Sequence, residues 1–493
     1  MRRNLNVLGW GMVLCAFAAA QETKPTPDPI EGKWSGMAGL PQDRVHIGFE
    51  FKRDEKQEIK VLVYNPVVNF FGLEVGTVSR NGNEYSAAAG PMHFILRNGK
   101  VDGTTEMGMP VQLERTSELP REMPVPELPS GPGPKWRTKL GGAIYAPVEV
   151  RGGVAYVGTT GGMFYAVRLS DGNFIWNFPA GHPIYGQALA TSDDLFFVCD
   201  NGFLYRLDRA SGKEIWRYDL GDAQASRVLP HQVDFNAPNS GDFDWDSTSP
   251  KPLLVDDVLY VGSGDGSFHA VKADRGSRVW RFEAKGKIRT DAVSTGTRII
   301  FGSFDRTVYA VDRETGSQIW SRSTGSPFTG SPAIIAGKVV IGNRGGALFA
   351  LDPATGQPAW RMLFWGSSVE STAVPGDAGL FYIGSSDMRR ISMIDSQDGR
   401  VAWRTDVFGW AWSRPAVTTT TVYAAAVGSS PYSVRQLGSI SALDRQSGKI
   451  LWRWPMPEWP GSLLNGFVSA PAIEGKTLIA GGLDGTLYAF PIE

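Results

Sequence analysis

A short pattern recurs along the last three-quarters of the chain and constrains what it can fold into. The pattern is Asp-x-x-Ser/Thr-Gly-x-x-x-Trp, and its clearest copy runs from Asp312 to Trp320. A period of about 40 residues is typical of proteins built from repeated supersecondary units. The recurring tryptophans are Trp136, Trp176, Trp216, Trp280, Trp320, Trp360, Trp403 and Trp452.

Each unit of the repeat predicts four short strands. In the copy that ends at Trp360, apolar runs begin at Ala333, Val339 and Ala347, and the last run carries the tryptophan. Gly356 precedes that last run, in a turn where a positive φ favours glycine. Four strands in about 40 residues are typical of one blade of a β-propeller. We expect the large indole to be buried in the seam between neighbouring blades.

The repeats predict eight blades in residues 134–493. Seven full units end at tryptophans from Trp176 to Trp452, and an eighth unit around Tyr488 ends without its tryptophan strand. The strand around Trp136 precedes the first unit. We expect it to complete the eighth blade, because such closure pairs the edges that an open array would leave exposed.

The N-terminal residues predict export from the cytoplasm. In residues 1–20, Arg2 and Arg3 precede an apolar run, and the run of alanines from Ala18 to Ala20 offers a signal-peptide cleavage site. The apolar run is short for a membrane span, and no later segment is apolar over about 18 residues. We therefore expect a periplasmic or secreted protein without a transmembrane segment, with association with the outer membrane as an alternative.

Residues 30–117 lack the repeat and predict a small antiparallel β-barrel or sandwich. Apolar positions from Val45 to Phe51 alternate with polar or small neighbours, as on a strand with one buried face, and two Asn-Gly pairs further on predict hairpin turns. Residues 21–29 predict a tether before this domain. Residues 118–133 are rich in proline and glycine and predict a linker to the propeller.

Composition indicates a folded chain with little net charge. Apolar residues make up 42% of the chain and charged residues 20%, and the net charge is -1. This balance lacks the basic surface that nucleic-acid-binding proteins need. The chain has 2 cysteines, Cys15 and Cys199, so a vicinal cysteine pair is absent.

The repeat resembles the pyrroloquinoline quinone (PQQ) repeat. The shared features are Ser-Pro-Ala before a strand, a Gly-Asp-Gly turn at 264–266, Tyr-Ala-x-Asp, and Thr-Gly-x-x-x-Trp. The resemblance implies an eight-bladed propeller like those of PQQ-dependent alcohol dehydrogenases and of BamB-like scaffolds in outer-membrane protein assembly. A dehydrogenase of this kind would hold PQQ and Ca²⁺ in its funnel, usually beside a vicinal cysteine pair, which this chain lacks.

Candidate binding residues come from the segment before each first strand, because that segment approaches the axis of a propeller. We expect one mouth of the central channel to be lined by Tyr145, Tyr185, Arg289, Phe328, Glu370, Trp412, Arg414 and Phe467. This set has a single carboxylate, which makes it a poor Ca²⁺ cage and a better aromatic and cationic pocket. A water-filled funnel, a small-ligand or peptide site and a PQQ site all remain open.

Two further segments are candidates for binding a partner. The longer interval after Trp216 comes from an insertion at 223–248, which predicts a solvated acidic loop. The candidate partner residues in it are Asp242, Asp244, Trp245 and Asp246. Their spacing resembles the start of a Ca²⁺ loop, but Ser247 stands where such a loop needs glycine. Trp410 belongs to an aromatic cluster that either packs on the propeller or contacts a partner.

The main functional prediction is an exported, non-catalytic, BamB-like propeller scaffold that binds protein or peptide partners in the cell envelope. We expect it to be monomeric and to have no resident cofactor, no metal and no catalytic residues. A PQQ- and Ca²⁺-dependent alcohol or sugar dehydrogenase is one alternative, and a propeller that binds a small ligand is another. The absent cysteine pair and the single carboxylate weigh against the dehydrogenase.

Overall fold

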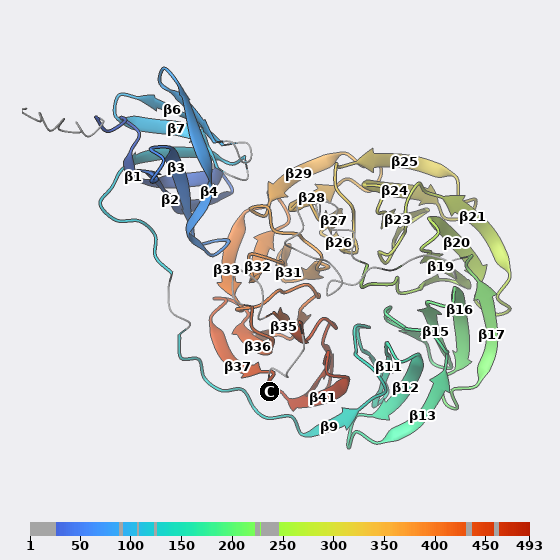
Figure 1. Cartoon of the computed structure of the whole chain (residues 1–493). Coiled ribbons are helices and arrows are strands. Elements are labelled where there is room, and N and C mark those ends of the chain that lie inside the picture. Colours follow the sequence, from blue (N-terminus) through green and yellow to red (C-terminus); the bar gives the residue numbers. More distant parts are fainter. Residues whose placement is uncertain are drawn as a thin grey trace, which may run out of the picture.

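The computed structural model shows two β units joined by an extended linker (Figure 1). Within the described residues every regular element is a strand, so no helix there could cross a membrane. The predicted signal peptide and the start of the predicted tether lie outside these residues. The structure describes residues 26–87, 92–105, 108–122, 126–221, 227, 246–429, 436–457 and 463–493.

The N-terminal unit is a closed antiparallel barrel. Its strands are β1 (Gly32–Leu40), β2 (Asp43–Arg53), β3 (Ile59–Asn65), β4 (Phe70–Asn81), β5 (Glu84–Ala87), β6 (His93–Arg97), β7 (Lys100–Thr104) and β8 (Pro110–Arg115). β1 pairs with both β2 and β8, which leaves no open sheet edge. Trp34, Phe49, Phe51 and Phe94 fill the interior and are almost completely buried. The predicted barrel is therefore confirmed, and its centre is a packed core.

The C-terminal unit is a ring of eight four-stranded sheets, the blades of a propeller, as the repeat predicts (Figure 1). Blade 1 comprises β10 (Glu149–Arg151), β11 (Val154–Gly158), β12 (Met163–Arg168) and β13 (Phe174–Pro179), and blade 2 comprises β14 (Leu189–Ala190), β15 (Asp194–Cys199), β16 (Phe203–Asp208) and β17 (Glu214–Asp219). Blade 3 comprises β18 (Leu253–Val255), β19 (Val258–Gly262), β20 (Ser267–Lys272) and β21 (Arg278–Glu283). Blade 4 comprises β22 (Val293–Thr295), β23 (Arg298–Gly302), β24 (Thr307–Asp312) and β25 (Gln318–Ser323).

Blades 5 to 8 continue the ring with the same strand order. Blade 5 comprises β26 (Ala333–Ile335), β27 (Lys338–Gly342), β28 (Ala347–Leu351) and β29 (Pro358–Leu363), and blade 6 comprises β30 (Val374–Pro375), β31 (Leu380–Gly384), β32 (Arg390–Asp395) and β33 (Val401–Asp406). Blade 7 comprises β34 (Ala416–Val417), β35 (Thr421–Gly428), β36 (Ser439–Asp444) and β37 (Ile450–Pro455), with β38 (Asn465–Gly466) beside β35. Blade 8 comprises β39 (Ala472–Glu474), β40 (Thr477–Gly481), β41 (Thr486–Pro491) and β9 (Trp136–Lys139).

The eighth blade combines strands from both ends of the propeller. β9 pairs antiparallel with β41, so that Trp136 lies opposite Ala489 and Lys139 lies opposite Thr486. The pairing covers the edge of β41 that would otherwise be open. The predicted closure of the ring is therefore confirmed.

The repeated tryptophan and glycine form one joint between neighbouring blades. Trp320 of blade 4 lies over Gly356 of blade 5, where a Cβ would come within 2.6 Å of the indole. Gly356 also has a φ of +68°, and the indole Nε1 of Trp320 donates a hydrogen bond to the carbonyl oxygen of Pro353 at 3.1 Å. Both the turn and the neighbouring ring therefore require glycine. The same joint places Trp136 over Gly172, Trp176 over Gly212, Trp216 over Gly276, Trp280 over Gly316, Trp360 over Gly399 and Trp403 over Gly448.

The seam tryptophans are less buried than the repeat predicts. Trp280 and Trp320 are buried. The half-buried ones are Trp136, Trp176, Trp216, Trp360, Trp403 and Trp452. Each of them stands on the outermost strand of its blade, where one edge of the ring reaches solvent. The predicted position between blades is correct, and the predicted depth is wrong for these six.

The linker supplies the eighth joint. Blade 8 takes its outermost strand from the start of the propeller, so Trp452 of blade 7 is not followed by the usual turn. Gly131 of the linker lies against the indole of Trp452 instead, and a Cβ at this position would overlap the ring. The backbone N–H of Gly131 donates to the carbonyl oxygen of Arg453 at 2.9 Å, and the N–H of Arg453 donates to the carbonyl oxygen of Pro129 at 2.9 Å. Part of the predicted linker is therefore an added strand-like edge on β37.

The barrel packs against blades 5 and 6, and Figure 1 shows it beside β29 and β33. Val67 and Val68 of the barrel share one apolar cluster with Trp365 and Met388 of the propeller. Burial of this apolar surface favours a fixed arrangement of the two units. Trp365 of the propeller thus lies in the contact with the barrel.

Polar groups surround this contact. Asp43 of the barrel is buried and accepts hydrogen bonds from Nε1 of Trp365, at 3.1 Å, and from Arg404. Nη2 of Arg390 donates to the carbonyl oxygen of Pro66 at 2.7 Å. Hydrogen bonds to a charged, poorly solvated carboxylate are stronger than bonds between neutral groups. Asp43 is therefore the main polar anchor of the barrel.

The substitution Asp43→Asn is expected to weaken docking of the barrel by about 1–3 kcal/mol, because it removes the charged acceptor of Trp365 and Arg404. Arg121 is exposed in the docked structure, and undocking would release the linker from the path that the docked barrel fixes. Trypsin should therefore cut after Arg121 faster than in the unmodified protein, as measured by mass spectrometry. The control is Asp102→Asn, an exposed position on β7. Equal cleavage rates for both variants would contradict the assignment.

Candidate functional site

Two rings of side chains line a cavity on the propeller axis. Each blade contributes two residues, i and i+2, from the extended segment that enters its first strand, since alternate side chains on an extended chain share a side. The empty space is about 790 Å³, part of which is open to solvent. The first ring comprises Tyr145, Tyr185, Ser247, Arg289, Thr329, Glu370, Trp412 and Val468. The second ring comprises Pro147, Gln187, Ser249, Asp291, Ser331, Thr372, Arg414 and Ala470.

The structure brings six of the eight predicted mouth residues together in this cavity. They are Tyr145, Tyr185, Arg289, Glu370, Trp412 and Arg414. Phe328 and Phe467 do not line it, because both are completely buried. Phe328 packs over Gly302 of the preceding blade, where a Cβ would come within 2.7 Å of it. The predicted register is one residue early at both positions, and the ring residues are Thr329 and Val468.

An apolar residue just before each ring position would have corrected this register. Ile184, Ile288 and Phe328 each cover the glycine that ends the second strand of the preceding blade. Aligning the units on this residue, instead of on aromatic residues, would have identified Thr329. Ser247 was missed because its segment follows the long insertion and has no obvious spacing to the next tryptophan.

Both charged residues of the first ring are paired. Oε1 of Glu370 lies 3.0 Å from Nε of Arg344, and Nε of Arg289 lies 3.0 Å from Oδ2 of Asp246. Asp246 also pairs with Arg227 at 2.9 Å. Burial alone would raise the pKa of Asp246, but the charges of Arg227 and Arg289 outweigh burial and lower the pKa. Asp246 is therefore ionised at neutral pH.

The burial of Asp246 contradicts one prediction about the insertion. Asp246 is completely buried, whereas the sequence predicts a solvated acidic loop. The cations around it compensate its charge, so this residue anchors the segment that enters blade 3 and does not face a partner. The other predicted residues of the loop, Asp242, Asp244 and Trp245, lie outside the described residues.

Trp410 takes the packing alternative of the two that the sequence leaves open. Its ring is buried and stacks on Trp412, with centroids 5.0 Å apart and planes at 8°. Its Nε1 donates to Oδ1 of Asp387 at 3.2 Å. Trp410 therefore supports the cavity wall behind Trp412, which is the packing alternative for the aromatic cluster.

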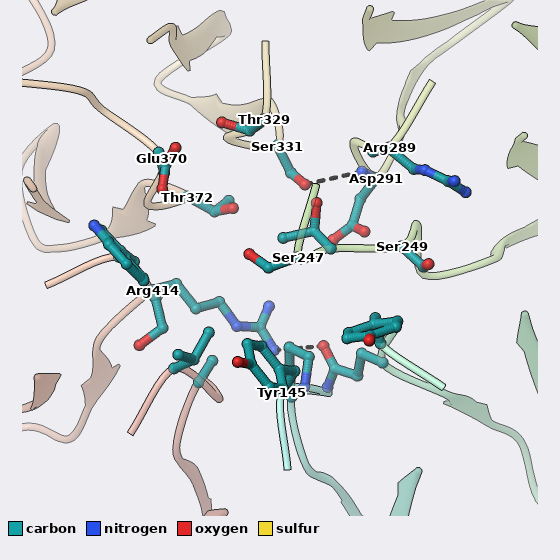
Figure 2. A pocket seen from close by; sticks show the side chains of 18 of the residues that line it. Tyr145, Ser247, Ser249, Arg289, Asp291, Thr329, Ser331, Glu370, Thr372 and Arg414 are labelled. Atoms are coloured by element: carbon teal, nitrogen blue, oxygen red, sulfur yellow. Dashed lines mark hydrogen bonds between the residues drawn. The ribbon is translucent and has the colours of Figure 1, made fainter. Parts of the chain in front are cut away.

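Arg414 is the cation of the second ring, and Figure 2 shows its side chain reaching the middle of the cavity. Nη2 of Arg414 donates to Oε1 of Gln187 at 3.1 Å. Nε2 of Gln187 donates in turn to Oε2 of Glu149 at 2.7 Å, and Nζ of Lys251 also contacts that oxygen at 2.8 Å. The bond to Glu149 fixes the orientation of the Gln187 amide, so its oxygen faces Arg414.

Asp291 is the acid of the second ring. Its Oδ1 accepts the backbone N–H of Lys251 at 2.7 Å. Burial raises the pKa of Asp291 above that of an ordinary carboxyl group, although this hydrogen bond and the charges of Arg414 and Lys251 act in the opposite direction. Asp291 therefore takes up a proton at a higher pH than an exposed aspartate does.

The cavity does not provide the ligands that Ca²⁺ and PQQ need. No group of three or more His, Cys, Asp or Glu side chains gathers among the described residues. The carboxylates of Glu370 and Asp291 are engaged separately, one by Arg344 and one by Lys251, while Ca²⁺ requires several converging oxygen ligands. One face of Trp412 is covered by Trp410, which leaves less ring surface for a planar quinone.

Eight blades joined by repeated indole and glycine contacts define a propeller of the PQQ-repeat class. A family model described as outer membrane protein assembly factor BamB matches residues 133–233, 200–364 and 359–493. These matches span the whole propeller, and the chain belongs to this family.

The sequence similarity to an individual relative covers less than a third of each chain. An outer membrane protein assembly factor BamB of Legionella pneumophila (strain Paris) is 25% identical over 143 residues, which are 29% of this chain and 31% of that protein. The chain thus matches about a third of the length of that relative.

Solved structures share the fold. A europium-containing methanol dehydrogenase superposes with a TM-score of 0.55 at 14% identity, over 73% of this chain and 93% of that chain. A computationally designed protein, Ika8, superposes with a TM-score of 0.54 at 14% identity, over 74% of this chain and 100% of that chain. An enzyme and a designed protein match equally well, so these similarities show the propeller and not a function.

Proposed function

We propose that this chain is an exported, non-catalytic propeller scaffold that binds a protein or peptide partner in the cell envelope, in a process of outer-membrane protein assembly. Membership of the BamB family supports the assembly role. The matched Legionella protein carries that role in its name, and the share of it that is matched makes its transfer to this chain part of the proposal.

The proposal rests on one observation, which is that both carboxylic acids lining the axial cavity are already engaged by other groups of the protein. Glu370 is paired with Arg344, and Asp291 is bonded to the backbone of Lys251. General acid–base catalysis on a carbohydrate or an alcohol needs an acid placed beside a second catalytic group or a metal. The two rings instead present aromatic, hydroxyl and cationic groups, which suit recognition of a peptide.

We further propose that the protein works without a resident cofactor. The residues of the cavity do not fit Ca²⁺ and PQQ, and we therefore rank a quinoprotein dehydrogenase second. The test is to mix the purified protein with PQQ and Ca²⁺ and to measure quinone absorbance after gel filtration, together with dye reduction by alcohols and sugars. Retained quinone with dye reduction would replace the scaffold by the dehydrogenase.

Filling the cavity is expected to abolish capture of the partner. Thr372 of the second ring points into the cavity (Figure 2), so Thr372→Trp would place an indole in the space that a partner needs. A pull-down from envelope extract should recover a polypeptide with the unmodified protein and not with this variant. The control is Ser317→Trp, the same change at an exposed turn of blade 4. Equal capture by both variants would move the binding surface away from the axis.

A further inference from the structure

The guanidinium group of Arg414 has N–H donors in the axial cavity that no described protein group accepts. An arginine side chain has five N–H donors, and Arg414 uses Nη2 for the amide oxygen of Gln187. Within the described part of the chain, no carboxylate lies within ion-pair distance of it and no other acceptor bonds its remaining N–H groups. A positive charge that faces a cavity and has one neutral acceptor is a ready site for an anion.

The other arginines of the cavity each form an ion pair with a carboxylate. Arg289 lies 3.0 Å from Asp246, and Arg344 lies 3.0 Å from Glu370. These ion pairs leave little attraction for an added charge, because each arginine already faces a carboxylate at contact distance. Arg414 therefore differs from them, since within the described residues no carboxylate lies within ion-pair distance of it.

Three hydroxyl groups around the cavity also lack a partner. Oγ1 of Thr248, Oγ1 of Thr329 and Oγ of Ser413 are buried and have no hydrogen-bond partner among the described residues, and all three residues line the cavity. Thr329 is only 6% exposed. A buried hydroxyl without a partner is costly. Of these three residues, Thr329 is the one at a ring position, because Thr248 and Ser413 lie between two ring positions and their side chains point to the opposite side.

The two phenols of the first ring can add further donors. Burial raises the pKa of Tyr185 to about 12, and burial also raises the pKa of Tyr145. Both hydroxyl groups therefore keep their protons at neutral pH. Their rings are arranged edge to face, with centroids 5.5 Å apart, and they form an apolar and donor-bearing wall beside Arg414.

We propose that the axial cavity binds a carboxylate group of a polypeptide partner, with Arg414 as the charged anchor and the hydroxyl of the ring residue Thr329 as an additional donor. The carboxylate comes either from the end of the partner chain or from an acidic side chain, which present the same chemistry. The limited space admits a chain end or a loop and not a folded domain. The choice of a polypeptide as the source rests on the proposed function, whereas the carboxylate site itself rests on the cavity.

Asp291 determines how binding depends on pH. Its carboxyl group lines the same cavity and would repel a bound carboxylate when ionised. Burial raises the pKa of Asp291, so repulsion sets in at a higher pH than for an ordinary aspartate. The charged groups around it from the other elements are Arg414, Lys251 with Glu149, Arg289 with Asp246, and Arg344 with Glu370.

The test is a calorimetric titration of the full-length protein with four short peptides. One is acetyl-Ala-Ala-Phe with a free C-terminal carboxylate, and the second is its C-terminal amide. The third is acetyl-Ala-Glu-Phe amide, and the fourth is acetyl-Ala-Lys-Phe amide. We expect the amide of the first peptide to bind about tenfold or more weakly than the free acid, because it loses a charge-assisted bidentate contact. Binding of the glutamate peptide as well would identify side chains as a second source.

Arg414 is tested with Arg414→Ala and Arg414→Gln, the second of which keeps a polar side chain if the first does not fold. Each is expected to weaken binding of the free acid about tenfold or more. The control is Arg275→Ala, on an exposed turn, which should bind like the unmodified protein.

The proposal is overturned if no peptide binds, if acid and amide bind equally, if the lysine peptide binds best, or if Arg414 variants keep full affinity. The pull-down can succeed when this titration fails, so the two proposals fail separately.

The role of Asp291 gives a further check on the same site. Affinity for the free acid should fall as the pH rises through the pKa of Asp291, because the peptide carboxylate, with a pKa of about 3.5, is already ionised. Asp291→Asn should keep its affinity over that range. The same decline in the variant would show that Asp291 does not face the bound carboxylate.

Discussion

The substitution Asp246→Ala is expected to lower the free energy of unfolding by about 3–5 kcal/mol. Asp246 is completely buried, and its carboxylate is shared by Arg227, Arg289 and Lys287, at 2.9, 3.0 and 3.6 Å. Alanine would leave these positive charges in a poorly solvated site without the negative charge that compensates them. Urea denaturation of the full chain would measure the effect as a lower midpoint.

The matched control is Asp257→Ala. Asp257 pairs with Lys272 at 2.7 Å, but its side chain is 65% exposed, so water replaces the lost partner and the midpoint should change little. The pKa of Asp246 is lower in the folded protein than in an unfolded chain. Its stabilisation is therefore present above about pH 4 and is lost as the pH falls through the lowered pKa. Equal effects of both variants at neutral pH would contradict a buried charge cluster.

The substitution Gly356→Val is expected to disrupt the joint between blades 4 and 5. Its φ of +68° disfavours any side chain, and a Cβ would come within 2.6 Å of the indole of Trp320. The strained backbone costs about 1–3 kcal/mol, and overpacking against the ring adds about 1–3 kcal/mol. The change should appear in thermal unfolding followed by tryptophan fluorescence.

Gly337→Val separates the two contributions. Gly337 has a φ of +78°, and nothing lies within 4 Å of the position of its Cβ, so only the backbone cost applies. The difference between the two variants then measures the contact with the indole. Replacing Trp320 by alanine in the Gly356→Val background should remove that difference, since the coupling is direct. A Gly356→Val variant that is no less stable than Gly337→Val would show that the indole moves away at no cost.

The repeat carried most of the information about the fold. The spacing of the tryptophans predicted the blades, and the orphan strand around Trp136 predicted the closure with β41, because both depend on local patterns and on covering sheet edges. The role of Gly131 could not be predicted, since a proline- and glycine-rich segment reads as a spacer and its pairing with Arg453 is a long-range contact. The docking of the barrel through Asp43 was missed for the same reason.

The axial site was predicted in outline. The segments that approach the axis follow from the fold, which is why most of the predicted mouth residues lie together. Phe328 was misplaced because an aromatic side chain suits a mouth as well as a seam, and only the neighbouring Gly302 reveals that it is buried. Asp291 and Thr329 were missed because short polar residues carry no periodic signal of their own. The sequence predicts Asp246 as a solvated acid because its pairing with Arg227 and its burial are tertiary properties.

The attachment of the linker to blade 7 affects how the ring would respond to tension. Trp136 enters its sheet opposite Ala489, so a pull on the start of β9 and on the end of β41 would peel the two strands apart one hydrogen-bonded pair at a time. A force applied through the barrel and the linker reaches β37 before it reaches β9, because the backbone of β37 holds the linker at Pro129 and Gly131. Force from the N-terminal unit therefore passes into the side of blade 7 before it reaches the pairing of β9 with β41.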